Sequence, residues 1–162
     1  MKYSVVLLII FVIASMCNAQ VAVPETESKE MGTSVYGIGL SAGIASGLGL
    51  SFRHHLPSKF SYQLIGGVIK VDKKVSYNLG SELQYDFTRG TSTRFFGVGT
   101  LGYFYHGESS NDVSGPLRIG LGIGGEFRMA ESLNIGAEFL FTYYSNGDIL
   151  PLPQFNLHYY FF

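Results

Sequence analysis

The sequence predicts an all-β fold, an eight-stranded antiparallel transmembrane β-barrel with up-and-down topology that follows a cleaved signal peptide. From residue 35 onward, apolar and polar residues alternate with a period of two, as in strands whose side chains point to opposite faces. One set is almost entirely aliphatic and aromatic, whereas the other holds charges, amides and glycine. A closed barrel in lipid needs this polarity, with the apolar face outside and the polar face enclosed.

Residues 1–19 have the features of a secretory signal peptide. Lys2 precedes an apolar run over residues 5–13, and small residues follow it as far as Ala19. The run is too short to span a bilayer as a helix, which takes about 20 residues. Cleavage after Ala19 would leave residues 20–33 as a short periplasmic leader and residues 34–162 as the barrel domain. A lipoprotein acylated at Cys17 is the alternative.

Composition argues against several classes of function. The chain has 21 Gly, 13 Phe and 11 Tyr, a mixture that disfavours helices and suits twisted strands. Its 11 basic and 12 acidic side chains give no basic excess, so we expect no nucleic-acid partner. Cleavage after Ala19 removes the one cysteine, which excludes disulfide and thiolate chemistry. We expect no cofactor and no metal, because the histidines are not at ligand spacing: His54, His55, His106 and His158.

The first four alternating runs are separated by turn signals. The run 35–41 ends at a glycine-rich turn, 43–47, and the run 48–55 ends at Pro57 and Ser58. The run 60–71 ends at Asp-Lys-Lys, and the run 75–87 ends at Thr-Arg-Gly-Thr. The outward positions are Tyr36, Ile38, Leu40, Leu48, Leu50, Phe52, Phe60, Tyr62, Leu64, Val68, Val75, Tyr77, Leu79, Leu83, Tyr85 and Phe87.

The last four runs are 94–105, 117–129, 133–144 and 155–162. The faces of the run 94–105 cannot be assigned from its pattern. The other three alternate clearly, and their outward positions are Leu117, Ile119, Leu121, Ile123, Phe127, Met129, Leu133, Ile135, Ala137, Phe139, Phe141, Tyr143, Phe155, Leu157, Tyr159 and Phe161.

An even number of strands places both chain ends on one side of the membrane, and closure removes the exposed edges that lipid would not tolerate. Long outer loops and short periplasmic turns are typical of such barrels. With both ends in the periplasm, the two longest outer connections are 106–115 and 145–153. We expect these two loops to rise above the others and to hold any extracellular ligand.

Seven charged residues are predicted to face the lumen: Arg53, Glu82, Asp86, Arg118, Glu126, Arg128 and Glu138. The interior of an eight-stranded barrel is just wide enough to be filled by side chains. Buried charges also require partners, because their desolvation is costly. We therefore expect these residues to pair across the lumen as a polar core, and the alternative is a path for protons or ions.

The repeated G-x-G strands, 97–99 and 120–124, and the aromatic end of the chain resemble the small outer-membrane β-barrel proteins of the eight-stranded porin-like or opacity type. The resemblance covers residues 34–162. It implies a Gram-negative outer membrane, contact with outer-membrane lipid and lipopolysaccharide, and insertion by the barrel-assembly machinery. That machinery reads a terminal phenylalanine and alternating apolar residues, here Phe155, Leu157, Tyr159, Phe161 and Phe162, with Phe162 one residue beyond the alternation.

The expected function is non-enzymatic: envelope integrity, adhesion or binding through the loops. A narrow porin-like conduit for small solutes is the first alternative. A second is a degenerate lipid A deacylase, which the end of the chain resembles at Ser145 and Asn146, although Tyr143 stands where that family has histidine. The two G-x-G-x-x-G stretches, 97–102 and 120–125, lie inside strands, so they do not predict a dinucleotide site. A soluble ligand-binding barrel would need the opposite polarity.

Overall fold

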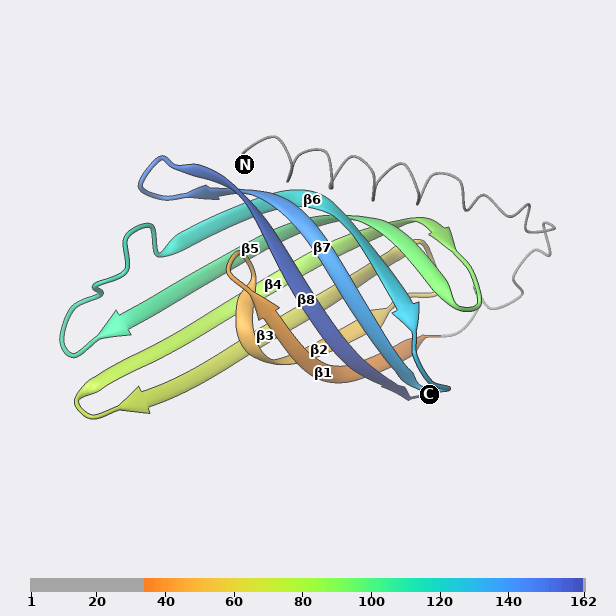
Figure 1. The fold of residues 1–162 in the computed structure, drawn as a ribbon, viewed down its shortest axis with the longest axis horizontal. Coiled ribbons are helices and arrows are strands. Elements are labelled where there is room, and N and C mark those ends of the chain that lie inside the picture. Colours follow the sequence, from red (N-terminus) through yellow and green to blue (C-terminus); the bar gives the residue numbers. More distant parts are fainter. Residues whose placement is uncertain (1–33, 162) are drawn as a thin grey trace, which may run out of the picture.

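The computed structural model describes residues 34–161. The predicted signal peptide 1–19, the leader 20–33 and Phe162 lie outside the described residues. Eight antiparallel strands form a closed barrel in which each strand pairs with its neighbours in sequence and β8 pairs with β1 (Figure 1). The strands are β1 (Val35–Gly43), β2 (Gly47–His55), β3 (Phe60–Val71), β4 (Lys74–Arg89), β5 (Thr93–Gly107), β6 (Leu117–Arg128), β7 (Leu133–Tyr144) and β8 (Ile149–Phe161). The predicted fold class and meander are confirmed.

No helix among residues 34–161 is long and apolar enough to cross a bilayer.

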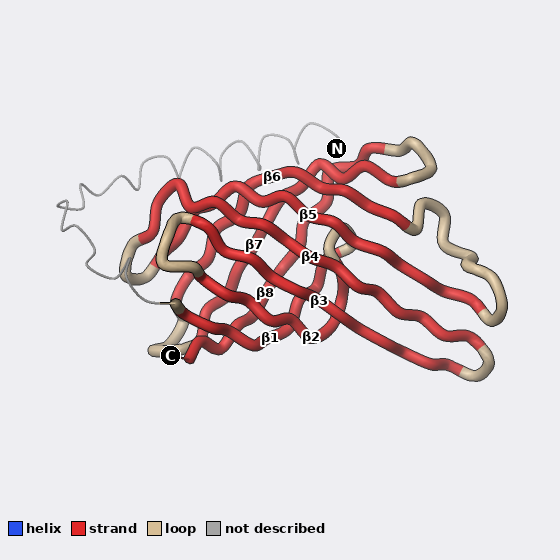
Figure 2. The backbone as a smooth tube through the Cα atoms, turned by 180° about the vertical axis from the view of Figure 1, so that it is seen from behind, coloured by secondary structure: helices blue, strands red, loops and turns tan. Residues whose placement is uncertain are grey.

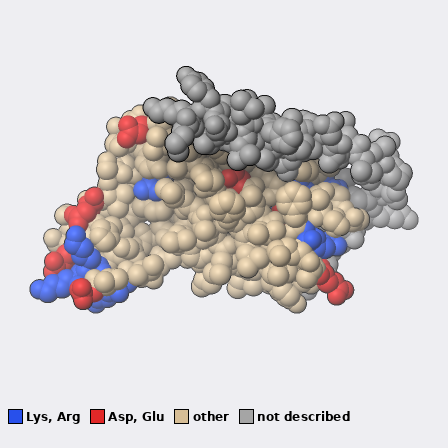
Figure 3. Space-filling model, in the orientation of Figure 1, with Lys and Arg blue, Asp and Glu red and all other residues tan. Residues whose placement is uncertain are grey.

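The polarity of the barrel is inverted relative to a water-soluble protein. Leu79 and Leu121 are 68% and 73% exposed on the outer wall, whereas Gln63 and Gln84 are fully buried inside. In the view of Figure 3, Lys, Arg, Asp and Glu gather toward the two ends, and the visible wall between them is mostly uncharged. The outer wall is therefore suited to lipid and the interior is polar.

The faces of β5 are now assigned. Arg94, Phe96 and Val98 are buried inside, whereas Phe95 and Leu101 are exposed on the wall. The pattern is hard to read because large apolar side chains lie on the inner face and glycines on the outer face, which is the reverse of the other strands. Phe96 and Val98 pack with Ala45 and Leu140 in a small apolar cluster inside the barrel.

Aromatic side chains gather near both ends of the wall. Toward the end that we expect to face the cell exterior, called the outer end below, the rings of Tyr77 and Tyr105 stack with their centroids 4.9 Å apart. Toward the other end, which holds both ends of the described chain and which we expect to be periplasmic, Phe60 packs against Tyr85 at 5.1 Å, and Tyr36 stacks on His54 at 4.3 Å. Amphipathic rings in two belts are typical of the two membrane–water interfaces.

The outer loops differ from the prediction. β8 begins at Ile149, so the expected loop 145–153 is wrong beyond Asp148. Pro151 and Pro153 lie within β8, opposite Phe141 and Phe139 of β7. The β1 side of β8 is unpaired there, because the last β1 partner is Gln154. Prolines lack a backbone N–H and are tolerated on such an edge. The two prolines therefore predict a loop from the sequence, although they lie in a strand.

The height of the outer end comes from strand length rather than loop length. β4 and β5 have 16 and 15 residues, whereas β1 and β2 have 9 each. In Figure 1 the β3–β4 turn and the β5–β6 connection, both on the left, reach farthest from the barrel. The β7–β8 turn, at the upper left, ends closer to the barrel. We call residues 67–78 of β3–β4 and 104–107 of β5 the outer extension, because they lie beyond the last partners in β2 and β6.

Candidate functional site: a filled lumen and a raised outer extension

Arg53 of β2 is the centre of the lumen. Its side chain is fully buried and forms an ion pair with Glu126 of β6. It donates hydrogen bonds to Gln63 Oε1 at 2.7 Å and to the Tyr160 hydroxyl at 3.2 Å. Its second terminal nitrogen lies 3.8 Å from Glu138 of β7. One guanidinium thus links five strands across the interior.

Arg94 of β5 is a second buried cation, which sequence reasoning missed because the faces of its strand were not assigned. It contacts Asp86 at 2.5 Å and donates to Gln84 Oε1 at 2.5 Å. Its guanidinium also lies 4.2 Å from the centroid of the Phe96 ring. Arg89, at the periplasmic end of β4, pairs with the same Asp86. Asp86 is therefore held between two arginines.

Amide side chains hold the remaining carboxylates. Gln154 donates from one nitrogen to Glu82 at 2.9 Å and to Glu138 at 2.6 Å. Asn156 donates to Glu138 at 2.9 Å, and Gln84 donates to Glu82 at 3.0 Å. This arrangement joins β4, β7 and β8 across the lumen.

The structure brings together five of the seven charges expected in the lumen: Arg53, Glu82, Asp86, Glu126 and Glu138. Arg118 is also buried, but it lies apart, stacked between Phe104 and Tyr144 at 3.8 and 4.8 Å from their ring centroids. Arg128 is exposed. It is the last residue of β6, so its side chain has left the lumen at the periplasmic rim and reaches water there.

The turn between β1 and β2, residues 44–46, folds into one end of the lumen against β4 and β5, and we call it the plug turn. Ala45 and Ser46 are fully buried. Figure 2 shows this turn among the strands, whereas the other outer turns lie at the barrel end. Ser46 donates from its backbone nitrogen and from its hydroxyl to Gln154 Oε1, at 3.3 and 3.1 Å. Arg118 donates to the Ile44 carbonyl at 2.6 Å, so both sides of the turn are anchored.

Glycines provide the space for the plug turn. A Cβ at Gly80 would overlap the carbonyl oxygen of Ser46, and a Cβ at Gly102 would overlap that of Ala45. These two glycines face each other across β4 and β5. Backbone of the plug turn therefore lies directly on backbone of the wall.

Replacing Gly80 with alanine is expected to push the plug turn away from the wall. Because the obstacle is backbone rather than a flexible side chain, the free energy of unfolding should fall by about 1–3 kcal/mol. Urea titration in detergent measures the loss, and hydrogen exchange at residues 44–48 should become faster. Gly99→Ala is the matched control, since the nearest atom to its Cβ would be 4.0 Å away. Equal behaviour of the two variants would contradict the close packing.

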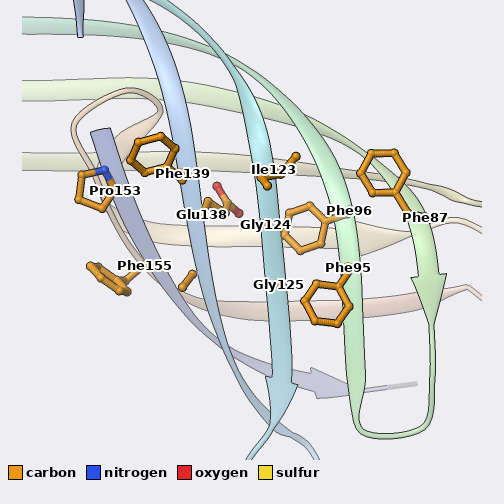
Figure 4. Close-up of a pocket in the computed structure, with 11 residues that line it drawn as sticks. Phe87, Phe95, Phe96, Ile123, Gly124, Gly125, Glu138, Phe139, Pro153 and Phe155 are labelled. Carbon is orange, nitrogen blue, oxygen red and sulfur yellow. The ribbon is translucent and has the colours of Figure 1, made fainter. Parts of the chain in front are cut away.

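The lipid-facing wall has a hollow of about 400 Å³ between β4, β5, β6, β7 and β8. Small residues open it at Gly125 and Ala137, and phenylalanine rings surround it (Figure 4). Glu138 lies at its floor beside Gly124, but its carboxylate is already bonded to Gln154 and Asn156. The hollow therefore offers an apolar surface for packing and no free acid for catalysis.

The structure places His158 far from Ser145, the serine of the hydrolase alternative. Ser145 is exposed directly after β7, whereas His158 lies inside the barrel opposite Asn134. Eleven strand residues separate these levels, roughly 35 Å at about 3.3 Å per residue. Both G-x-G-x-x-G stretches lie inside β5 and β6, without the strand-to-helix turn that a dinucleotide needs. Within residues 34–161, no group of three His, Cys, Asp or Glu side chains is placed to hold a metal ion.

No protein-family model and no curated protein matches the sequence. Among solved structures, the N-terminal β-barrel domain of Pseudomonas aeruginosa OprF is 15% identical, with a TM-score of 0.56 over 79% of this chain and 96% of that one. Yersinia pestis Ail is 11% identical, with a TM-score of 0.47 over 80% and 99% of the two chains. Neisserial surface protein A is 14% identical, with a TM-score of 0.36 over 78% and 91%. With its apolar wall and polar lumen, the chain has the fold of the small eight-stranded β-barrels of the bacterial outer membrane.

Proposed function

We propose that this protein is a sealed outer-membrane barrel that carries a raised β-sheet extension on the cell surface for binding, without catalysis or conduction. The observation that supports this most is the filled lumen. Arg53 and Arg94 with their carboxylates occupy its periplasmic half, and the plug turn covers it from the outer side. With the interior closed, the exposed outer extension is the part available for an interaction.

The orientation that this role requires rests on the two barrel ends. The turns at 56–59, 90–92 and 129–132 are short and lie at the end where the described chain begins and finishes. The opposite end carries the longest connection, 108–116, and the tall β3–β4 hairpin. Barrels of this class place short turns in the periplasm and longer structures outside.

Export and insertion belong to the same proposal. Residues 1–19 would direct the chain to the periplasm and residues 20–33 would remain there. Phe155, Leu157, Tyr159 and Phe161 all project to the outer face of β8, which supports their role, with Phe162, as the signal for the barrel-assembly machinery. Outer-membrane lipid and lipopolysaccharide would surround the wall.

A narrow conduit is the competing function, and planar-bilayer recording separates the two. We expect the purified full-length protein to give no conductance steps, with a general porin in the same bilayer as the control for insertion. On intact cells, an impermeant amine reagent should label Lys70 and Lys73, which lie on the outer extension, and should spare Lys59 at the other end. Regular steps from the native protein would favour the conduit, and labelling of Lys59 alone would reverse the orientation.

A further inference from the structure

The outer extension has one open β-edge. The β1–β2 hairpin turns inward as the plug, so the last residue of β3 with a β2 partner is Gly66, opposite Leu50. The Asn78 side chain of β4 accepts a hydrogen bond from the Leu48 N–H at 3.0 Å and donates one to the Leu48 carbonyl at 2.9 Å. These two bonds fix the first residues of β2 where they leave β3. Beyond this point β3 pairs only with β4. The same inward fold that fills the lumen thus leaves one side of residues 68–71 unpaired within the described chain.

An unpaired edge of this kind displays backbone hydrogen-bonding groups. In an antiparallel pair, alternate residues direct both N–H and C=O to the same side. Two of the four residues 68–71 therefore turn donors and acceptors toward the open side. The edge lies at the level of the outer aromatic belt, since Val68 is opposite Tyr77, where fewer water molecules are available to satisfy these groups.

The other edges at this end are protected. On β5, the Asn111 side chain donates to the Phe104 carbonyl at 2.9 Å and accepts from the His106 N–H at 3.1 Å. The Asp112 N–H donates to the His106 carbonyl at 2.8 Å. On β8, Pro151 and Pro153 remove two donors. Loop caps and edge prolines are common ways to prevent strand pairing, and residues 68–71 have neither.

The side chains along the edge are apolar on both faces and basic at the tip. Val68, Ile69 and Val71 are 74%, 59% and 64% exposed. Lys74 pairs with Asp112 at 3.2 Å, whereas Lys70 and Lys73 have no ion-pair partner among residues 34–161. A strand that docks here would form main-chain hydrogen bonds and apolar contacts on alternate residues. Acidic groups on that strand would be attracted to the lysines at the tip.

We propose that residues 68–71 of β3 bind an extended acidic peptide segment of a partner protein by strand addition. Lipid headgroups have no alternating donors and acceptors at strand spacing, so a polypeptide fits this edge better. A second copy of the chain fits less well, because antiparallel pairing of two identical short edges brings their Lys70 and Lys73 side chains together. This inference rests on the proposed surface role.

The test uses the full chain in detergent micelles and two fluorescent peptides of alternating valine and threonine, one ended by glutamates and one by lysines. Fluorescence anisotropy should show saturable binding of the glutamate peptide alone. Hydrogen exchange should slow on binding at residues 68–71 and not elsewhere. The variant Lys70→Pro, which removes an edge donor, should weaken binding at least tenfold, and heat-modifiable migration on gels checks that it folds.

The double variant Lys70→Glu with Lys73→Glu is used if the proline variant does not fold. Its affinity for the glutamate peptide should also fall at least tenfold. Lys59→Glu, at the periplasmic end, is the matched control and should bind normally. Equal binding of both peptides, protection away from residues 68–71, or edge-to-edge dimers in place of peptide binding would overturn the inference. Conductance of the native barrel would overturn the surface role, whereas a sealed barrel that ignores the peptide would overturn the docking edge alone.

Discussion

Replacing Arg53 with alanine is expected to lower the free energy of unfolding by about 3–5 kcal/mol, as the loss of one partner from a buried ion pair does. The guanidinium is the positive group closest to both Glu126 and Glu138. Without it, these two carboxylates remain enclosed with amides and Arg94. The cost arises from buried charge that has lost its counterion, and less from the lost contacts themselves.

Urea titration in phospholipid vesicles, followed by heat-modifiable migration, measures this loss. Arg128→Ala is the matched control, because it removes an arginine that is exposed at the barrel rim. Its effect should stay within about 0.5 kcal/mol, as is usual for surface substitutions. Adding Glu126→Gln to Arg53→Ala should recover part of the loss, since it removes one unpaired charge. Equal effects of the two single variants would show that the lumen is open to water.

Much of the wall was predictable because lipid requires apolar residues at every second position of each strand, on the outward face. In β4, the outward residues from Val75 to Phe87 are apolar or aromatic except for Ser81, and they differ sharply from the inward Glu82 and Asp86. Alternation alone therefore assigns the faces of this strand. β5 breaks this rule, since Phe96 and Val98 point inward to pack against Ala45 and Leu140. For that reason the sequence did not identify Arg94 as a lumen residue, although Arg94 lies on the same face of β5 as Phe96 and Val98.

The outer end could not be predicted from loop lengths. The β3–β4 turn has only two residues between Val71 and Lys74, yet long strands carry it above the other loops. The plug turn depends on tertiary contacts with Gln154 and Arg118, which lie far away in sequence. A signal was present in hindsight: Gly80 and Gly102 are inward glycines on paired strands, a pattern typical of a place where another backbone approaches closely.

Substituting Leu121 with arginine is expected to cost about 2–4 kcal/mol in a lipid bilayer, the usual penalty for a basic side chain at the midplane of a barrel wall. Leu121 is 73% exposed and lies between Gly99 and Phe141 near the middle of β6. The arginine would have to leave lipid by bending toward an interface or would stay desolvated. Either choice destabilises the inserted barrel relative to the unfolded chain.

Leu117→Arg on the same strand and the same face separates the effect of lipid from that of the strand itself. Leu117 is the first residue of β6, near the outer rim, where the penalty for arginine should fall to about 0–1 kcal/mol. Both variants are measured by urea titration in phospholipid vesicles. A water-soluble barrel would accept arginine equally at these two exposed positions, within about 0.5 kcal/mol. The difference between the two penalties, rather than either one alone, therefore decides whether hydrocarbon surrounds this wall.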